Sequence, residues 1–224
     1  MKTEEKARAR DLRARGWSVK EIERELGVSR SSVSLWVRDV RLGPDELSRL
    51  VERTRLGPLV AGKRKADAAR QQRLVYQGEG RRLARERGAS YAAGCMLYWA
   101  EGSKQRNTVK LTNADPEVVA FFARFLRTEF GVDHGKMSIR CNLFADHIER
   151  PREIEDFWLS RLELPRASLR RSIVNVYSKY SQKKRVNKLP YGTCALMVHS
   201  SRIVQTIYGS IQEYGGFERP EWLD

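Results

Sequence analysis

Hydrophobic residues near the start of the chain recur at the three- and four-residue spacing of short amphipathic helices. The pattern predicts a helix from Lys6 to Arg15 that ends at Gly16, and a second helix that begins after Ser18. Glu21 follows Ser18 at the spacing of a capping box, in which each side chain accepts a hydrogen bond from the other residue's backbone. A third helix is predicted from Arg30 to Arg38.

The third predicted helix has one apolar face and one polar face. Val33, Trp36 and Val37 fall at positions i, i+3 and i+4 and are expected to point inward. The opposite face carries small, apolar or basic side chains: Ser31, Ser34, Leu35 and Arg38, with Arg30 at the exposed start. Two short helices joined by a glycine-containing turn, with such a face on the second, are what a helix-turn-helix needs to enter the major groove.

The segment WSVKEIERELGVSRSSVSLWVRD resembles the helix-turn-helix of resolvases, transposases and many repressors. The resemblance implies that the outer face of the third helix contacts DNA and that Ser29 lies near a phosphate. The residues implied to face DNA are Arg30, Ser31, Ser34 and Arg38. The alternative is a three-helix bundle that binds another protein.

Residues 41–90 form a basic stretch with an Arg- and Ala-rich, helical composition. They carry 13 basic and 6 acidic side chains, and Gly43-Pro44 and Gly57-Pro58 are expected to break the segment. We interpret residues 43–88 as a helical linker that lies along the phosphate backbone. A charged linker that faces only water is the alternative.

The rest of the chain mixes helical and alternating patterns, which indicates an α+β fold. An apolar helix runs to Glu101 and Gly102, and a basic hairpin follows, in which Val109 and Leu111 alternate with polar residues. A second amphipathic helix is predicted from Pro116, closed by Gly131. Further strands are predicted over residues 136–143, 173–180 and 193–199, with a helix after Pro151 and a last helix from Ser200 or Ser201.

The order of helix, Glu-Gly-Ser, basic strand and Asn-x-Asp-Pro resembles the LAGLIDADG family of homing-endonuclease-like DNA-binding domains. The resemblance covers Leu97 to Gly131 best. It implies an α-β-β-α-β-β-α domain over residues 89–224 with one inserted helix, preceded by a helix-turn-helix domain over residues 1–42. The basic residues of the hairpin turn and strand faces are then candidates for DNA contact: Lys104, Arg106, Lys110 and Arg140. The basic turn Lys183, Lys184 and Arg185 is a candidate phosphate contact or a solvated turn.

In the LAGLIDADG family a terminal acid of each of two paired helices holds a divalent metal over the scissile phosphates. The resemblance places that acid at Glu101, as a metal ligand and catalytic residue, with Lys188 as a candidate basic partner. Cleavage would need Mg²⁺ and a homodimer through the helix 92–100, whereas binding alone needs no cofactor. The alternative for Glu101 is a helix-terminal carboxylate that bonds to backbone or to Lys104.

Composition narrows the class of partner. The 224 residues carry a formal net charge of +15, which favours a polyanion as partner. The three cysteines are widely spaced and the three histidines share no ligand spacing, so a disulfide framework or zinc site is not expected, and each histidine is expected to face solvent or stand on a strand. No signal peptide or membrane segment is visible, and we expect a cytoplasmic, nucleoid-associated protein.

These patterns leave three functional hypotheses. The preferred one is a sequence-specific double-stranded DNA-binding protein, a transcriptional regulator whose LAGLIDADG-like domain is degenerate. The second is a metal-dependent DNA endonuclease that acts as a homodimer. The third is an RNA- or ribosome-binding protein.

Overall fold

The computed structural model describes residues 3–144, 147–175 and 189–224. The chain forms two compact units, Met1–Ala68 and Ala69–Asp224, and one long helix contributes to both. The predicted strand residues 176–180, Lys183, Lys184, Arg185 and Lys188 lie outside the described residues. No helix among the described residues is long and apolar enough to cross a membrane.

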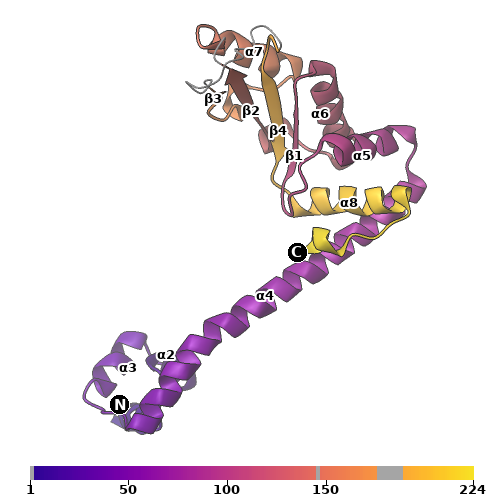
Figure 1. Cartoon of the computed structure of the whole chain (residues 1–224). Helices are drawn as coiled ribbons and strands as arrows, with labels where there is room; N and C mark the ends of the chain where they lie inside the picture. Colours follow the sequence, from indigo (N-terminus) through magenta and orange to yellow (C-terminus); the bar gives the residue numbers. More distant parts are fainter. Residues whose placement is uncertain (1–2, 145–146, 176–188) are drawn as a thin grey trace, which may run out of the picture. The chain divides into compact units, whose positions relative to one another are not determined.

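The N-terminal unit begins with three short helices. They are α1 (Thr3–Ala14), α2 (Val19–Leu26) and α3 (Arg30–Val37), as the periodicity predicts (Figure 1). The capping box of Ser18 and Glu21 is present, and Gly27 ends α2 in the left-handed conformation with φ 64°. Ala9, Ile22, Val33 and Val37 form the small buried core that holds the three helices together.

Helix α4 (Pro44–Glu86) is continuous, although the sequence predicted breaks in this segment. Pro58 lies inside the helix, where it removes one backbone hydrogen bond without ending the helix. From residue 56 to residue 69 every position of α4 is exposed, whereas Arg73, Gln77, Gly80 and Ala84 are buried.

The second unit carries a four-stranded sheet covered by helices on one face (Figure 1). Its elements after α4 are α5 (Ala89–Glu101), β1 (Val109–Asn113), α6 (Pro116–Phe130), η1 (His134–Lys136), β2 (Met137–Phe144), α7 (Pro151–Arg161), η3 (Arg166–Ser168), β3 (Ile173–Asn175), β4 (Thr193–Val198), α8 (Ser201–Gly215) and η4 (Pro220–Leu223). The strand order is β1-β4-β2-β3; β4 is antiparallel to β1 and β2, and β2 is parallel to β3.

The sheet differs from the predicted layout in its first part. The expected hairpin before α6 is a single strand, β1, because residues 104–108 form a loop and only Gly102 bridges back to Leu111. The described part of the third strand, Ile173–Asn175, pairs in parallel with β2. The inserted helix after Pro151 and the last helix, capped by Ser200, are confirmed.

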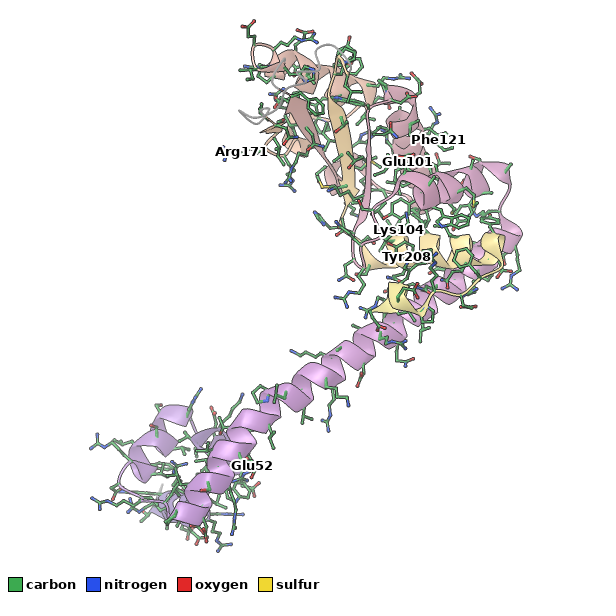
Figure 2. The ribbon with its side chains drawn as sticks, in the orientation of Figure 1. Glu52, Glu101, Lys104, Phe121, Arg171 and Tyr208 are labelled. Atoms are coloured by element: carbon green, nitrogen blue, oxygen red, sulfur yellow. The ribbon has the colours of Figure 1, made fainter. Side chains whose placement is uncertain are left out.

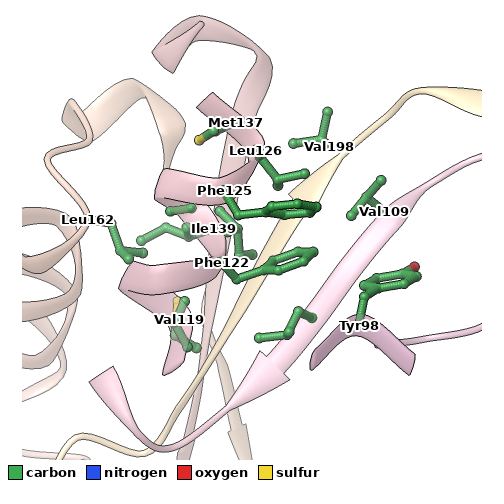
Figure 3. Close-up of a cluster of buried hydrophobic side chains, with 14 of the residues drawn as sticks. Tyr98, Val109, Val119, Phe122, Phe125, Leu126, Met137, Ile139, Leu162 and Val198 are labelled. Carbon is green, nitrogen blue, oxygen red and sulfur yellow. The ribbon is translucent and has the colours of Figure 1, made fainter. Parts of the chain in front are cut away.

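The main core lies between the sheet and the helices that cover it. Figure 3 shows Phe122, Phe125 and Leu126 of α6 packed toward the strand residues Val109 and Val198. All three cysteines belong to this core: Cys95, Cys141 and Cys194. Burial raises the pKa of the Cys95 and Cys141 thiols to about 12, and it also raises that of Cys194.

The last turns of α4 are joined to α8 by close backbone approach and a buried polar network. A Cβ on Gly80 would lie 1.9 Å from the Thr206 carbonyl oxygen, and one on Gly209 would lie 2.0 Å from that of Gln77. Gln77 donates to Gln205 (2.7 Å) and accepts from the Gln212 side chain (3.0 Å). These buried amides satisfy one another, so residues 73–84 are an integral part of the second unit.

Candidate nucleic-acid interface

The outer face of α3 is the first candidate interface. Its exposed residues are those predicted from the periodicity: Arg30, Ser31, Ser34, Leu35 and Arg38. Leu35 is 65% exposed, a large fraction for an apolar side chain on a helix that also contributes two residues to a core. The face therefore combines two cations, two hydroxyls and one apolar contact.

The start of α3 is fixed by a group of serine hydroxyls. Ser29 caps the helix, because its hydroxyl accepts a hydrogen bond from the Ser32 backbone N–H (3.3 Å). The same hydroxyl lies 3.0 Å from that of Ser31 and 2.9 Å from that of Ser32. An N-terminal turn with free backbone N–H groups and hydroxyl donors is suited to a phosphate oxygen.

The end of α3 is tied to α1 by one arginine. Arg10 donates to both carboxylate oxygens of Asp39 (2.6 and 2.9 Å) and to the Trp36 carbonyl (2.9 Å). The Arg10 guanidinium lowers the pKa of the Asp39 carboxyl. Both ends of α3 are thus held by side chains that lie off its outer face.

The sheet face turned away from the helices that cover the sheet is the second candidate interface. Because residues directly opposite in neighbouring antiparallel strands share a face, the register places Lys110, Met197 and Ser138 in one row and Thr112, Ala195 and Arg140 in the next. Asn142 donates to Thr193 (3.0 Å) in the third row. Helices cover the other face, which carries Val109, Leu111 and Ile139.

Lys110 and Arg140 lie on this sheet face as the alternating pattern predicted. Both are half-buried, and the Nε atom of the Arg140 guanidinium is buried. Ala195 stands between Thr112 and Arg140, and its small side chain leaves the row shallow. On the described strands this face is mainly polar and carries two cations, Lys110 and Arg140, but it also holds the apolar residues Met197 and Ile173, of which Ile173 is 43% exposed.

Glu101 is the last residue of α5, and Lys104 lies in the loop between α5 and β1; Figure 2 labels both. Lys104 Nζ donates to the carbonyls of Tyr98, Trp99 and Gly102 (3.1, 2.8 and 2.6 Å), so it caps the helix. Burial lowers the pKa of Lys104, an effect that Glu101 opposes. The exposed Glu101 carboxylate accepts a hydrogen bond from the Asn113 amide (3.3 Å).

The predicted DNA contacts therefore fall into separate places. Ser29, Arg30, Ser31, Ser34 and Arg38 lie together on the N-terminal unit, and Lys110 and Arg140 lie on neighbouring rows of the sheet. Arg106 is exposed in the loop before β1. The Lys104 ammonium group donates hydrogen bonds to carbonyls at the end of α5. Contact of Lys104 with DNA stays a prediction.

The glycine of α5, Gly94, packs against another helix of the same chain. A Cβ on Gly94 would meet the Phe125 ring at 2.2 Å, so this residue packs against α6 and does not lie on a free face. The exposed positions of α5 are instead Ala89, Ser90, Ala93, Met96, Ala100 and Glu101. Pairing of two chains through residues 92–100 stays a prediction.

One histidine differs from the expectation that all three face solvent or stand on a strand. His147 is buried, and its Nδ1 accepts a hydrogen bond from the Phe144 backbone N–H (3.1 Å). His199 Nδ1 lies 3.2 Å from the Thr108 hydroxyl. Within residues 3–144, 147–175 and 189–224, no three His, Cys, Asp or Glu side chains gather closely enough to hold a metal ion.

Comparison with protein-family models matches residues 1–48 to the homeodomain-like domain. The N-terminal unit is thus a helix-turn-helix, a domain type that suggests DNA as the partner. Nothing in the comparison identifies a LAGLIDADG domain. The curated proteins and the solved structures that were compared gave no match.

Sequence reasoning left several polar residues of the sheet face out of the candidate interface. Thr112, Asn142 and Thr193 share that face with Lys110 and Arg140. Each follows the two-residue alternation of its strand, so the pattern contains the signal. The alternation does not reveal which strands are neighbours in the sheet. The residues come together because β4 pairs between β1 and β2.

Proposed function

We propose that this protein is a sequence-specific double-stranded DNA-binding protein that regulates transcription, with α3 as its recognition helix. One observation carries the proposal: the exposed face of α3 combines Arg30, Ser31, Ser34, Leu35 and Arg38 on a helix fixed at both ends. The match of residues 1–48 to a homeodomain-like domain supports it.

The chemistry of this face suits the major groove. An arginine can donate two hydrogen bonds to a guanine edge, serines donate or accept at any base, and an apolar side chain contacts a thymine methyl group. Arg30 is the first residue of α3. In helix-turn-helix proteins the N-terminal residues of the recognition helix contact base edges. Ser29 adds a phosphate contact that positions the helix without specifying sequence.

The sheet face is proposed as a second DNA contact that resembles the LAGLIDADG arrangement. Support comes from the one-sided covering of the sheet and from Lys110 and Arg140 on neighbouring rows. With few cations on the described strands, this face would contribute affinity, and the sequence preference would come from α3. The single-strand form of the first hairpin is a departure from that family's layout.

Cleavage of DNA is not part of the proposal. A two-metal site needs several oxygen ligands, whereas the Glu101 carboxylate accepts a hydrogen bond from the Asn113 amide. The described residues of one chain therefore do not fit a divalent-metal site at Glu101.

A binding-site selection followed by titration of the selected duplex tests the proposal. Arg30→Ala is expected to weaken binding to the selected site by about 10- to 100-fold, because a base contact is worth about 1–3 kcal/mol. Its affinity for random duplex should fall only as much as in Arg24→Ala, a control that removes one exposed cation from α2. If Arg30→Ala and Arg24→Ala lose the same affinity, on the selected duplex and on the random duplex alike, base recognition by α3 is refuted.

Two further outcomes separate the remaining hypotheses. If structured RNA competes better than duplex DNA at equal salt, the partner is RNA. If the selection enriches no sequence and the full chain has no affinity for duplex, the three helices are a protein-binding bundle.

A further inference from the structure

A heptad pattern runs along the exposed part of α4 in the N-terminal unit. Its residues alternate in steps of three and four: Arg49, Glu52, Leu56, Leu59, Lys63 and Ala66. Such steps place all six on one side of a helix, and we call this set the α4 seam. Leu56 is 47% exposed and Leu59 is 65% exposed.

The seam needs a covering partner for physical reasons. A helix gains most of its stability from packing its apolar face, and here residues 56–69 are exposed on every side. Gly57, Pro58 and Gly62 weaken helix formation further in this stretch. Two adjacent leucines on one face of such a helix are the natural contact for another helix.

The charges of the seam show which helix fits. Consider a second α4 placed antiparallel to the first, with Leu56 of one chain facing Leu59 of the other. Each step toward the N-terminus of one helix is then matched by an equal step toward the C-terminus of its partner. Glu52 then faces Lys63, and Arg49 faces Ala66 with Asp67 beside it. Glu52 and Lys63 are both exposed, and among the described side chains neither forms an ion pair; Figure 2 labels Glu52 on α4.

We propose that the α4 seam binds the α4 seam of a second copy of this chain in an antiparallel pair. By the two-fold symmetry each contact occurs twice, with two Leu56–Leu59 contacts flanked by two Glu52–Lys63 ion pairs. Gly57 and Pro58 fall at outward positions of the heptad, where they do not interrupt the contact. The pair supplies two helix-turn-helix units per particle.

A parallel pair does not fit the same residues. In parallel coiled coils each seam residue meets its own copy, which would oppose Arg49 to Arg49, Glu52 to Glu52 and Lys63 to Lys63. Like charges at facing positions are unfavourable, so the pattern specifies orientation as well as partner.

Charge exchange between Glu52 and Lys63 tests the pair without DNA. Sedimentation velocity of the full chain is expected to show a dimer that Glu52→Lys or Lys63→Glu weakens by about tenfold or more, because each change creates two repulsive pairs. The double variant restores opposite charges and should restore the dimer. An equimolar mixture of the two single variants should form a heterodimer, because positions 52 and 63 then face each other with opposite charges at both contacts.

Matched controls make the result decisive. Both substituted residues are exposed, so circular dichroism should be unchanged in every variant. Met96→Glu places a charge on the exposed face of α5 and should leave the dimer intact. A monomer at all concentrations, single variants that dimerise like the unchanged chain, or loss of the dimer in Met96→Glu alone would each overturn the proposal.

Cysteine cross-linking tests the orientation directly. A mixture of Leu56→Cys and Leu59→Cys chains should form an interchain disulfide under mild oxidation, because the antiparallel pair brings these positions together. Leu56→Cys alone should cross-link poorly. Efficient cross-linking of Leu56→Cys with itself, without a mixed disulfide between positions 56 and 59 in the mixture, would show a parallel pair and refute the register.

Discussion

The two ends of α4 share one helix but meet opposite surroundings. In residues 73–84 the buried positions are Arg73, Gln77, Gly80 and Ala84, which pack within the second unit. In residues 56–69 every position is exposed, and the seam there carries Leu56, Leu59, Lys63 and Ala66. Glycine occurs in both parts, so the residue type alone does not reveal its role. What surrounds it decides whether it weakens the helix or permits close packing.

The largest expected effect comes from adding a methyl group where α4 meets α8. Gly80→Ala should destabilise the second unit by at least about 3 kcal/mol, the upper end of overpacking costs, because the new Cβ would meet the Thr206 backbone. Gly78→Ala, two residues away with nothing within 4 Å, is the matched control. Denaturant unfolding of both variants measures the difference, and similar stabilities would disprove the close helix contact.

Removal of the central amide should have the next largest effect. Gln77→Ala leaves the Gln205 side-chain oxygen without its donor and the Gln212 amide with one acceptor fewer. We expect a loss of about 1–3 kcal/mol, the cost of leaving a buried polar group unsatisfied. Gln72→Ala, at an exposed position, should change nothing. Faster hydrogen exchange of the α8 amides would report the loss; unchanged exchange would mean that the network adds no stability.

A smaller effect of opposite sign is expected in the exposed part of α4. Gly62→Ala should stabilise the helix by about 0.5–1 kcal/mol, because no atom lies within 4 Å of the added Cβ and alanine is the better helix former. Slower hydrogen exchange across residues 58–66 measures this gain. Destabilisation would mean that Gly62 is packed against a partner.

The smallest effect belongs to an ion pair on the surface between α4 and α8. Arg202 donates to both Glu79 carboxylate oxygens (2.6 and 3.3 Å), but its side chain is 64% exposed. Arg202→Ala should cost only about 0.2–1 kcal/mol, and less in high salt. Thermal unfolding at two salt concentrations measures it. A salt-independent loss as large as that of Gln77→Ala would place this ion pair among the buried contacts.

The helix-turn-helix was the most predictable part of the molecule, because its signals are local. Ser18 with Glu21, Gly27 and Ser29 each fix a helix end within four residues, and the structure places all of them as expected. The outer face of α3 followed from the same periodicity. Local chemistry therefore predicted both the fold of this unit and its candidate interface.

The sheet was less predictable, because pairing is not a local property. The alternation of Val109 and Leu111 predicted the faces of β1, but the expected hairpin required a second strand that residues 102–108 do not form. For the same reason the packing roles of Gly80 and Gly94 could not be predicted from the sequence. Gly80 makes room for Thr206 and Gly94 for Phe125, and both partners are distant along the chain. The role of α4 in the second unit also depended on such contacts.

The three core cysteines make the folded chain inert to alkylating reagents. A thiol reacts through its thiolate, and Cys95 and Cys141 have pKa values near 12 inside a core that reagents do not enter. Maleimide dyes should therefore label an introduced surface cysteine and spare the native ones, without any need for a cysteine-free background. When the second unit unfolds, the same thiols become reactive. The rate of their alkylation therefore reports the unfolding of this unit.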